Sequence, residues 1–263
     1  MALDSSLFGA SIPAGTYTAG DRIPMACIRG PAVVRSGYGA ALLKKIFTVG
    51  TASGFKIVVK NSNWVDSMSN PVLAMSETTM DDNATSIQRG HDCDLMPNSS
   101  WEVYAEAYST VTTTANTTVF ALLDIDYPSV SSISNPRVEK GAPVTTDMIT
   151  PTVTILADTA DPATMAWTTF TVDILKAGYR YLLAQASYMA SAATTIGFIE
   201  ISGAAGQNGL ARIVPVRANG NNGIRYLIDY STPLVKGPMN IAVAGVGTAG
   251  TTTPYLYLDW VKR

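Results

Sequence analysis

The sequence is poor in charge, in histidine and in cysteine. Only 14% of its 263 residues are charged, against roughly 25% in a typical soluble domain. A formal net charge of -2 provides no basic field of the kind that nucleic-acid binding requires. We therefore expect no nucleic-acid partner. We also expect a surface that is polar without charge or is covered by neighbouring copies.

The single histidine removes most catalytic arrangements, because a Ser-His-Asp or Cys-His site would have to use His91. His91 stands in "RGHDCDLMPN" beside Asp92, Cys93 and Asp94, a mixed set that could supply zinc ligands. Consecutive residues seldom converge on one ion, and no second His/Cys cluster would complete the shell. We interpret the segment as a polar loop and predict no metal, no cofactor and no enzymatic activity.

Two further groups of acidic residues invite a chemical interpretation. Asp124 and Asp126 form a carboxylate pair two residues apart, which on one face of a strand lies within glycosidase spacing. Asp81, Asp82 and Asn83 could bind calcium, but no oxygen-rich loop of EF-hand spacing is present. We interpret Asp124 and Asp126 as the solvent side of an amphipathic strand.

Cysteine and apolar runs are also scarce. Cys27 and Cys93 make no disulfide framework, and two free buried thiols are favoured over one bridge. Apolar runs such as Val119 to Leu123 are far shorter than the roughly 20 residues of a membrane span. The first residues lack the basic region and apolar core of a secretory signal. We expect neither a membrane partner nor a secretion signal.

Short alternating runs bounded by Gly, Pro, Asn and Ser fill the chain, and sustained helical periodicity is absent. In the run from Trp101 to Tyr108 the odd-numbered apolar residues share one face. From Val119 to Tyr127 the odd-numbered positions again form an apolar face. The pattern predicts an all-β protein. Further strands are expected at Val33–Val34 and at residues 41–49, 55–60, 153–157, 168–174, 180–189, 196–202, 211–217, 224–230, 239–246 and 255–261.

A weak internal repeat suggests two tandem domains. "GYGAALLKKIFTVGTA" resembles "GYRYLLAQASYMASAA", "GFKIVVKNS" resembles "GFIEISGAA", and each half ends on a strand with a matching aspartate, Asp124 or Asp259. Each half has the size of a two-sheet sandwich, so we predict two jelly-roll-like β-sandwiches that arose by duplication. The expected boundaries are an N-terminal arm at 1–12, a first sandwich at 13–128, a Pro-rich linker at 129–150 and a second sandwich at 151–263.

The first half also contains short sequence motifs that resemble those of a known protein family. "GTYTAGDRIPMACIRGPAVVRSGYGAALLKKIFTV", then "FKIVVKNSNW" and "NTTVFALLDIDY", resemble a family of small virion-associated proteins of tailed bacteriophages. The match covers roughly residues 13 to 127, and the second half joins it only through the internal repeat. The resemblance implies a β-sandwich structural role on the capsid, such as decoration, and brings no catalytic or ligand residues.

These observations predict a viral structural protein that is a decoration, auxiliary or shell component of the virion. The protein would be made in the host cytoplasm. Its partners would be further copies of itself, as a homo-oligomer such as a trimer, and other capsid proteins. Two alternatives are a double jelly-roll major capsid protein and a carbohydrate-binding tail-fibre or adhesin module. Apolar residues of the arm and outward tyrosines are the candidate subunit-interface anchors, with sheet stabilisation or sugar stacking as other roles for the tyrosines. These residues are Leu3, Leu7, Phe8, Tyr104, Tyr108, Tyr255 and Tyr257.

Overall fold

The computed structural model describes residues 3–39, 41–50, 52–65, 71–76, 86–87, 93–127, 144–172, 181–189, 194–202, 210–217, 224–227 and 239–262. Within these residues, apart from two single-turn 3-10 helices, the regular structure is all strand. The chain divides into two compact units. The first comprises Asp4–Ser129 and Asp158–Thr164. The second comprises Met1–Leu3, Val130–Ala157 and Met165–Arg263.

The first unit contains eleven described strands and both 3-10 helices, η1 (Ser36–Tyr38) and η2 (Pro162–Thr164). The strands are β1 (Leu3–Ile12), β2 (Gly15–Tyr17), β3 (Arg22–Arg29), β4 (Ala41–Gly50), β5 (Phe55–Val65), β6 (Pro71–Ser76), β7 (Ser86–Ile87), β8 (Cys93–Leu95), β9 (Trp101–Ala107), β10 (Val111–Thr113) and β11 (Thr117–Asp126).

The second unit contains ten described strands. They are β12 (Val144–Ile149), β13 (Val153–Ala157), β14 (Thr168–Val172), β15 (Tyr181–Met189), β16 (Thr194–Ser202), β17 (Arg212–Arg217), β18 (Ile224–Leu227), β19 (Met239–Gly247), β20 (Gly250–Thr252) and β21 (Tyr255–Lys262).

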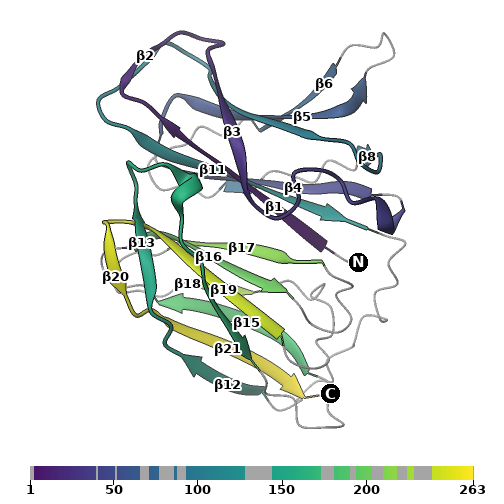
Figure 1. Cartoon of the computed structure of the whole chain (residues 1–263), viewed down its shortest axis with the longest axis vertical. Helices are drawn as coiled ribbons and strands as arrows, with labels where there is room; N and C mark the ends of the chain where they lie inside the picture. Colours follow the sequence, from purple (N-terminus) through teal and green to yellow (C-terminus); the bar gives the residue numbers. More distant parts are fainter. Residues whose placement is uncertain are drawn as a thin grey trace. The chain divides into compact units, whose positions relative to one another are not determined.

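The two units have the same strand order. In the first unit, β6, β5, β9 and β3 are neighbours on one side, and β1, β11, β4 and the short β7 and β8 on the other. In the second unit, β17, β16, β19 and β14 form one sheet, and β12, β21, β15 and β18 the other. Figure 1 shows β16, β17 and β19 as one layer of the second unit and β12, β15 and β21 as the other. Each unit is therefore an eight-stranded jelly roll, with β7 and β8 together taking the place of β18.

The correspondence extends to residue register. In the first unit Asp124 pairs with Lys45 and Ile125 with Leu43, so the ladder skips one residue of β4. In the second unit Asp259 pairs with Gln185 and Trp260 with Leu183, and again one residue is skipped. A β-bulge thus follows the matching aspartate in both rolls. The repeat detected in the sequence aligns strands that occupy the same place in the two units.

The rolls differ in how their sheets are joined. In the first unit β1 is hydrogen-bonded to both β11 and β3, so one strand connects the two sheets. In the second unit the described part of β12 pairs with β21 alone. The ribbon of β2 and β10 stands as its own two-stranded sheet, whereas its counterpart, β13 and β20, joins the sheet through β19.

Two boundaries differ from the sequence prediction. Residues 3–12, expected to form a separate arm, are β1, and residues 144–149, expected in the linker, are β12. Both segments find hydrogen-bonding neighbours that are far away in sequence, which local composition does not reveal. The rest of the expected linker, residues 129–143, lies outside the described residues.

The interior of each roll is built from alternate residues of facing strands, as a period of two requires. In the first unit the buried side chains include Phe55, Ile57, Val103, Leu123 and Ile125. In the second unit they include Ile199, Ile201, Ile241, Val243 and Leu256.

The expectation that Asp124 and Asp126 face solvent is wrong. They are only 1% and 4% exposed, so β11 is buried on both faces. The neighbouring strand β1 explains part of this burial, because the hydroxyl of Ser5 donates a hydrogen bond of 2.7 Å to the Asp124 carboxylate.

Candidate functional site

The first group of predicted interface residues lies inside the first unit. Leu7 and Phe8 are buried at 0% and 3% exposure in β1, which has a neighbour on each edge. Leu3 begins the same strand, and its side chain is outside the described residues. Leu7 and Phe8 therefore contribute to the packing of their own roll and are not presented to another subunit.

The predicted tyrosines do not form one site. Tyr104 lies on the outer face of β9, with the Arg22 guanidinium 5.7 Å from its ring centroid and its hydroxyl 3.2 Å from the Glu102 carboxylate. Tyr108 follows β9 and is exposed, as is Tyr255 in the second unit. Tyr257 lies on β21, and its side chain is outside the described residues.

Tyr104 belongs to a ladder of charged residues across β3, β9 and β5. Arg22 and Lys56 both pair with Glu106, at 2.6 and 3.0 Å, and Lys60 approaches Glu102 at 3.4 Å. These contacts follow the strand register, because Arg22 and Lys56 are the partners of Glu106 on either side. Opposite charges in such cross-strand positions stabilise a sheet.

The electrostatics of the ladder keep Glu106 ionised. Burial acts to raise the pKa of Glu106, but hydrogen bonds from Arg22 and Lys56 and their positive charges outweigh it and lower the pKa below its usual value. A carboxyl group held ionised by two cations is poorly suited to donate a proton as a general acid. We interpret the ladder as a stabilising surface feature.

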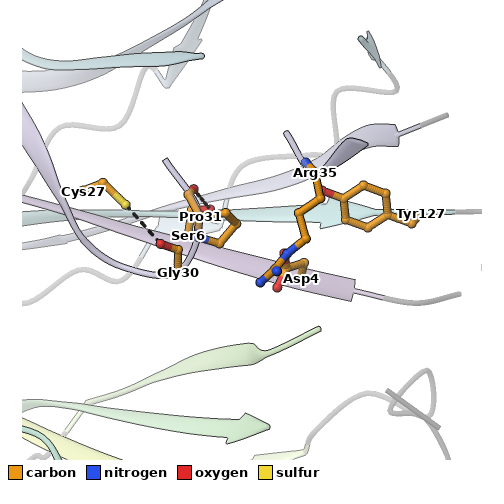
Figure 2. A network of polar contacts seen from close by, with 7 residues as sticks. All are labelled: Asp4, Ser6, Cys27, Gly30, Pro31, Arg35 and Tyr127. Atoms are coloured by element: carbon orange, nitrogen blue, oxygen red, sulfur yellow. Dashed lines mark hydrogen bonds and ion pairs between the residues drawn. The ribbon is translucent and has the colours of Figure 1, made fainter. Parts of the chain in front are cut away.

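A second polar network ties the loop after β3 to the N-terminal half of β1 (Figure 2). Arg35 pairs with Asp4 at 2.6 Å, and the Asp4 side chain is completely buried. The Ser6 hydroxyl donates to the Pro31 carbonyl at 2.7 Å. At the other end of the loop, the Cys27 thiol contacts the Gly30 carbonyl at 3.6 Å. We call Asp4, Ser6, Gly30, Pro31 and Arg35 the β1 clamp.

Tyr127 completes the network beside the β1 clamp. The backbone N–H of Arg35 donates to the Tyr127 hydroxyl at 3.0 Å, and the Tyr38 ring lies 5.2 Å from the Tyr127 ring, measured between centroids. The partners come from β1, from the loop and the helix η1 that follow β3, and from the residue directly after β11. The arrangement fixes a loop over one end of the roll and offers no exposed reactive group.

The network predicts a stability loss in alkali. Burial raises the pKa of Tyr127 from 10.0 to about 12. Above pH 10 the unfolded chain therefore ionises at this residue before the folded chain does. Stability that is present below pH 10 should fall by up to about 3 kcal/mol as the pH rises to 12. Denaturant unfolding at a series of pH values measures this. Between pH 10 and 12 the free energy of unfolding of Tyr127→Phe should fall less steeply with pH than that of the wild type, whereas Tyr108→Phe should match the wild type. The same pH dependence of the free energy of unfolding for Tyr127→Phe and wild type would contradict this account.

Most of the other residues considered for chemistry lie outside the described part of the chain. This holds for His91, Asp92 and the calcium candidates at 81–83, and for the side chains of Cys93 and Asp94. Cys27 is a free thiol, so the alternative of a bridge to Cys93 is excluded. Among the residues that the structure describes, no group of three or more His, Cys, Asp or Glu side chains could hold a metal ion.

Sequence reasoning missed the β1 clamp. Its members are spread over 31 positions between Asp4 and Arg35, and the motif that contains Gly30, Pro31 and Arg35 does not point to Asp4 or Ser6 as their partners. The one available signal was the Gly-Pro step at Gly30, which marks a turn but does not reveal what the turn crosses.

In the described ranges, no helix is long and apolar enough to cross a membrane. No protein-family model matches the sequence, and no curated protein matches it. The resemblance to tailed-bacteriophage virion proteins therefore stays a prediction.

Several solved structures show a distant likeness to the chain. The turret protein A223 of Sulfolobus turreted icosahedral virus is 9% identical, with 99% of each chain covered and a TM-score of 0.23. A structure of the Gx strain of infectious bursal disease virus is 10% identical over 98% of this chain and 71% of that chain, with a TM-score of 0.27. The PBSX exported protein XepA is 11% identical over 97% and 86%, with a TM-score of 0.24. Likeness at this level assigns no function to this protein.

Proposed function

We propose that this protein is a structural component of a virus particle, which acts by self-association and by docking on other capsid proteins. The observation that carries the proposal is the pair of jelly rolls with one strand order and one shared bulge position. Jelly rolls are a characteristic architecture of viral capsid domains. Because folds are shared by unrelated functions, the proposal needs a direct test.

The surface chemistry supports the same proposal. A chain with 14% charged residues has little electrostatic repulsion to overcome when copies pack closely. The net charge of -2 favours a position in the shell or on its outside over a position against packaged genome. After synthesis in the host cytoplasm, the protein would then reside in the virion.

Within this class, the matched rolls favour the double jelly-roll capsid protein over a single-domain decoration protein. The shared bulge in the ladders of β11 with β4 and of β21 with β15 is what a duplication would leave. We infer that the two rolls arose by duplication and that the chain forms closed symmetric oligomers.

Light scattering on size-exclusion fractions, followed by negative-stain microscopy, tests the proposal. We expect concentration-dependent trimers, with a pseudo-hexagonal outline if the chain is a double-roll capsid protein and another outline if it is auxiliary. A chain that stays monomeric across the accessible concentrations would contradict self-association.

A carbohydrate-binding adhesin is the second candidate, favoured by the exposed Tyr255 and by the occurrence of jelly rolls in lectins. Tyr104 is a weaker sugar platform, because Arg22 lies over its ring. A glycan array with wild type and Tyr255→Ala separates the candidates. Binding that disappears in the variant would support the adhesin, and an array without binding would oppose it.

A further inference from the structure

The connection between β13 and β14 belongs to the first unit. Residues Asp158–Thr164 pack within that unit, whereas β13, which ends at Ala157, and the chain from Met165 onward belong to the second. The connection contains η2 and is closed on itself, because the Asp161 carbonyl accepts hydrogen bonds from the Thr164 N–H at 3.0 Å and from the Thr164 hydroxyl at 2.7 Å. We call Asp158–Thr164 the strap.

Two hydrogen bonds fix the strap to β11. The backbone N–H of Thr118 donates to the Asp158 carbonyl at 2.8 Å, and the Thr118 hydroxyl donates to the Ala160 carbonyl at 2.9 Å. Thr118 is buried, at 3% exposure. The ladder of β11 with β4 starts at Val119, so the Thr118 amide reports directly on whether the strap is in place.

A glycine on β1 makes room for the strap. An added Cβ at Gly9 would lie 2.6 Å from the Cβ and 3.1 Å from the Cγ of Pro162, which is buried. The third neighbour, Ile28 Cδ1 at 3.3 Å, is the end of a flexible side chain and can move aside. Gly9 is not among the glycines of positive φ, so alanine fits its backbone conformation. Gly9→Ala therefore acts on the strap and not on the backbone of β1.

The two ends of the strap lead directly into ordered parts of the second unit. On one side β13 ends next to Asp158. On the other side the Trp167 ring lies 6.3 Å from the Phe198 ring, measured between centroids, and the Thr168 hydroxyl donates to the Thr152 carbonyl at 2.8 Å. The chain therefore has little slack on either side of the strap.

We propose that the strap couples the stability of β13 and β14 to the folding of the first unit. The position of the strap is formed by β1 and β11, so it exists only while the first unit is folded. In the described part of the chain β14 pairs with β19 alone, which makes its stability sensitive to how its first residue is held. Local openings spread through contiguous segments of this kind. The inference concerns a single copy of the chain and goes beyond the proposed virion role.

Hydrogen exchange of the full chain tests the coupling. Gly9→Ala should raise the exchange rate of the Thr118 amide by about tenfold or more, because that amide loses its hydrogen-bond partner. Peptides from β13 and β14 should also exchange faster, while β16 keeps its protection. Gly15→Ala is the matched control in the same unit: an added Cβ would meet only the Tyr17 ring, at 3.9 Å, and exchange should be that of the wild type.

A double variant shows whether the clash is the cause. Pro162→Gly removes the Cβ that an alanine at position 9 would meet, so Gly9→Ala should have a smaller effect in the Pro162→Gly background than in the wild type. If Gly9→Ala also removes the protection of β5 and β9, it has unfolded the first unit. Thr118→Val then takes its place, because it removes the hydroxyl bond to the strap and keeps the size of the side chain.

Two results would overturn the inference. The first is wild-type exchange at the amide of residue 118 in both Gly9→Ala and Thr118→Val, which would mean that these contacts do not hold the strap. The second is faster exchange at this amide with unchanged exchange in β13 and β14, because the strap would then serve the first unit alone. Neither result affects the proposed self-association.

Discussion

Gly30→Ala is expected to lower the free energy of unfolding of the first unit by more than about 3 kcal/mol. Gly30 has a φ of +82°, a conformation that strains any residue with a Cβ atom. An added Cβ would also meet the Ser5 carbonyl oxygen at 2.2 Å and the Ser6 Cα at 3.1 Å. Both obstacles are backbone atoms of β1, so no side-chain rotation relieves the clash. The loop would have to lift and break the β1 clamp.

Gly20→Ala is the matched control. Gly20 also has a positive φ, of +95°, but an added Cβ would meet nothing within 4 Å. Gly20→Ala should lower the free energy of unfolding only by the conformational strain, about 1 kcal/mol. Denaturant unfolding of both variants, monitored by a spectroscopic probe in the first unit, compares their free energies of unfolding. Equal losses would mean that the close crossing of the loop over β1 does not limit the stability of this roll.

Deleting residues 1–12 is expected to prevent stable folding of the first unit. The deletion removes β1, which hydrogen-bonds to β3 and β11 and buries Leu7, Phe8 and Ile12. Each such side chain contributes roughly 1.5–3 kcal/mol, and the total stability of a domain is only about 5–15 kcal/mol. The deletion also leaves Arg35 without its Asp4 partner and Asp124 without the Ser5 hydroxyl.

Hydrogen exchange read by mass spectrometry measures the effect of this deletion for each unit separately. Peptides from β5, β9 and β11 should lose their protection in the truncated chain, while peptides from β16 and β19 serve as the internal reference. Retained protection of β11 would contradict the account and restore the interpretation of residues 1–12 as a detachable arm.

A period of two in hydrophobicity predicted much of the strand content. The strand at Val153–Ala157 was predicted with its observed bounds, and the alternation from Trp101 to Tyr108 places Trp101 and Val103 in the interior as expected. These strands each have one apolar face, so the sequence alone carries the signal.

The errors concern segments whose surroundings decide their structure. The sequence "LDSS" at the start of β1 is typical of a polar, solvent-exposed terminus. Asp4, Ser5 and Ser6 are nevertheless fully buried, because each has a polar partner elsewhere in the roll. Local patterning cannot reveal a partner that lies 25 or more residues away. The β1 clamp was missed for this reason.

The same limit explains the outward face of β11. Alternation correctly separated Asp124 from its apolar neighbours, but it does not report whether a polar face is covered. The repeat was more informative, because the sequence alone aligns Asp124 with Asp259, and both aspartates lie beside the same bulge.

Cryo-electron microscopy of the assembled protein tests the central claim most directly. The account predicts ordered assemblies whose subunits each contain two jelly rolls of matching strand order. A map in which the subunits do not show two such rolls, or a preparation that forms no ordered assembly, would contradict it.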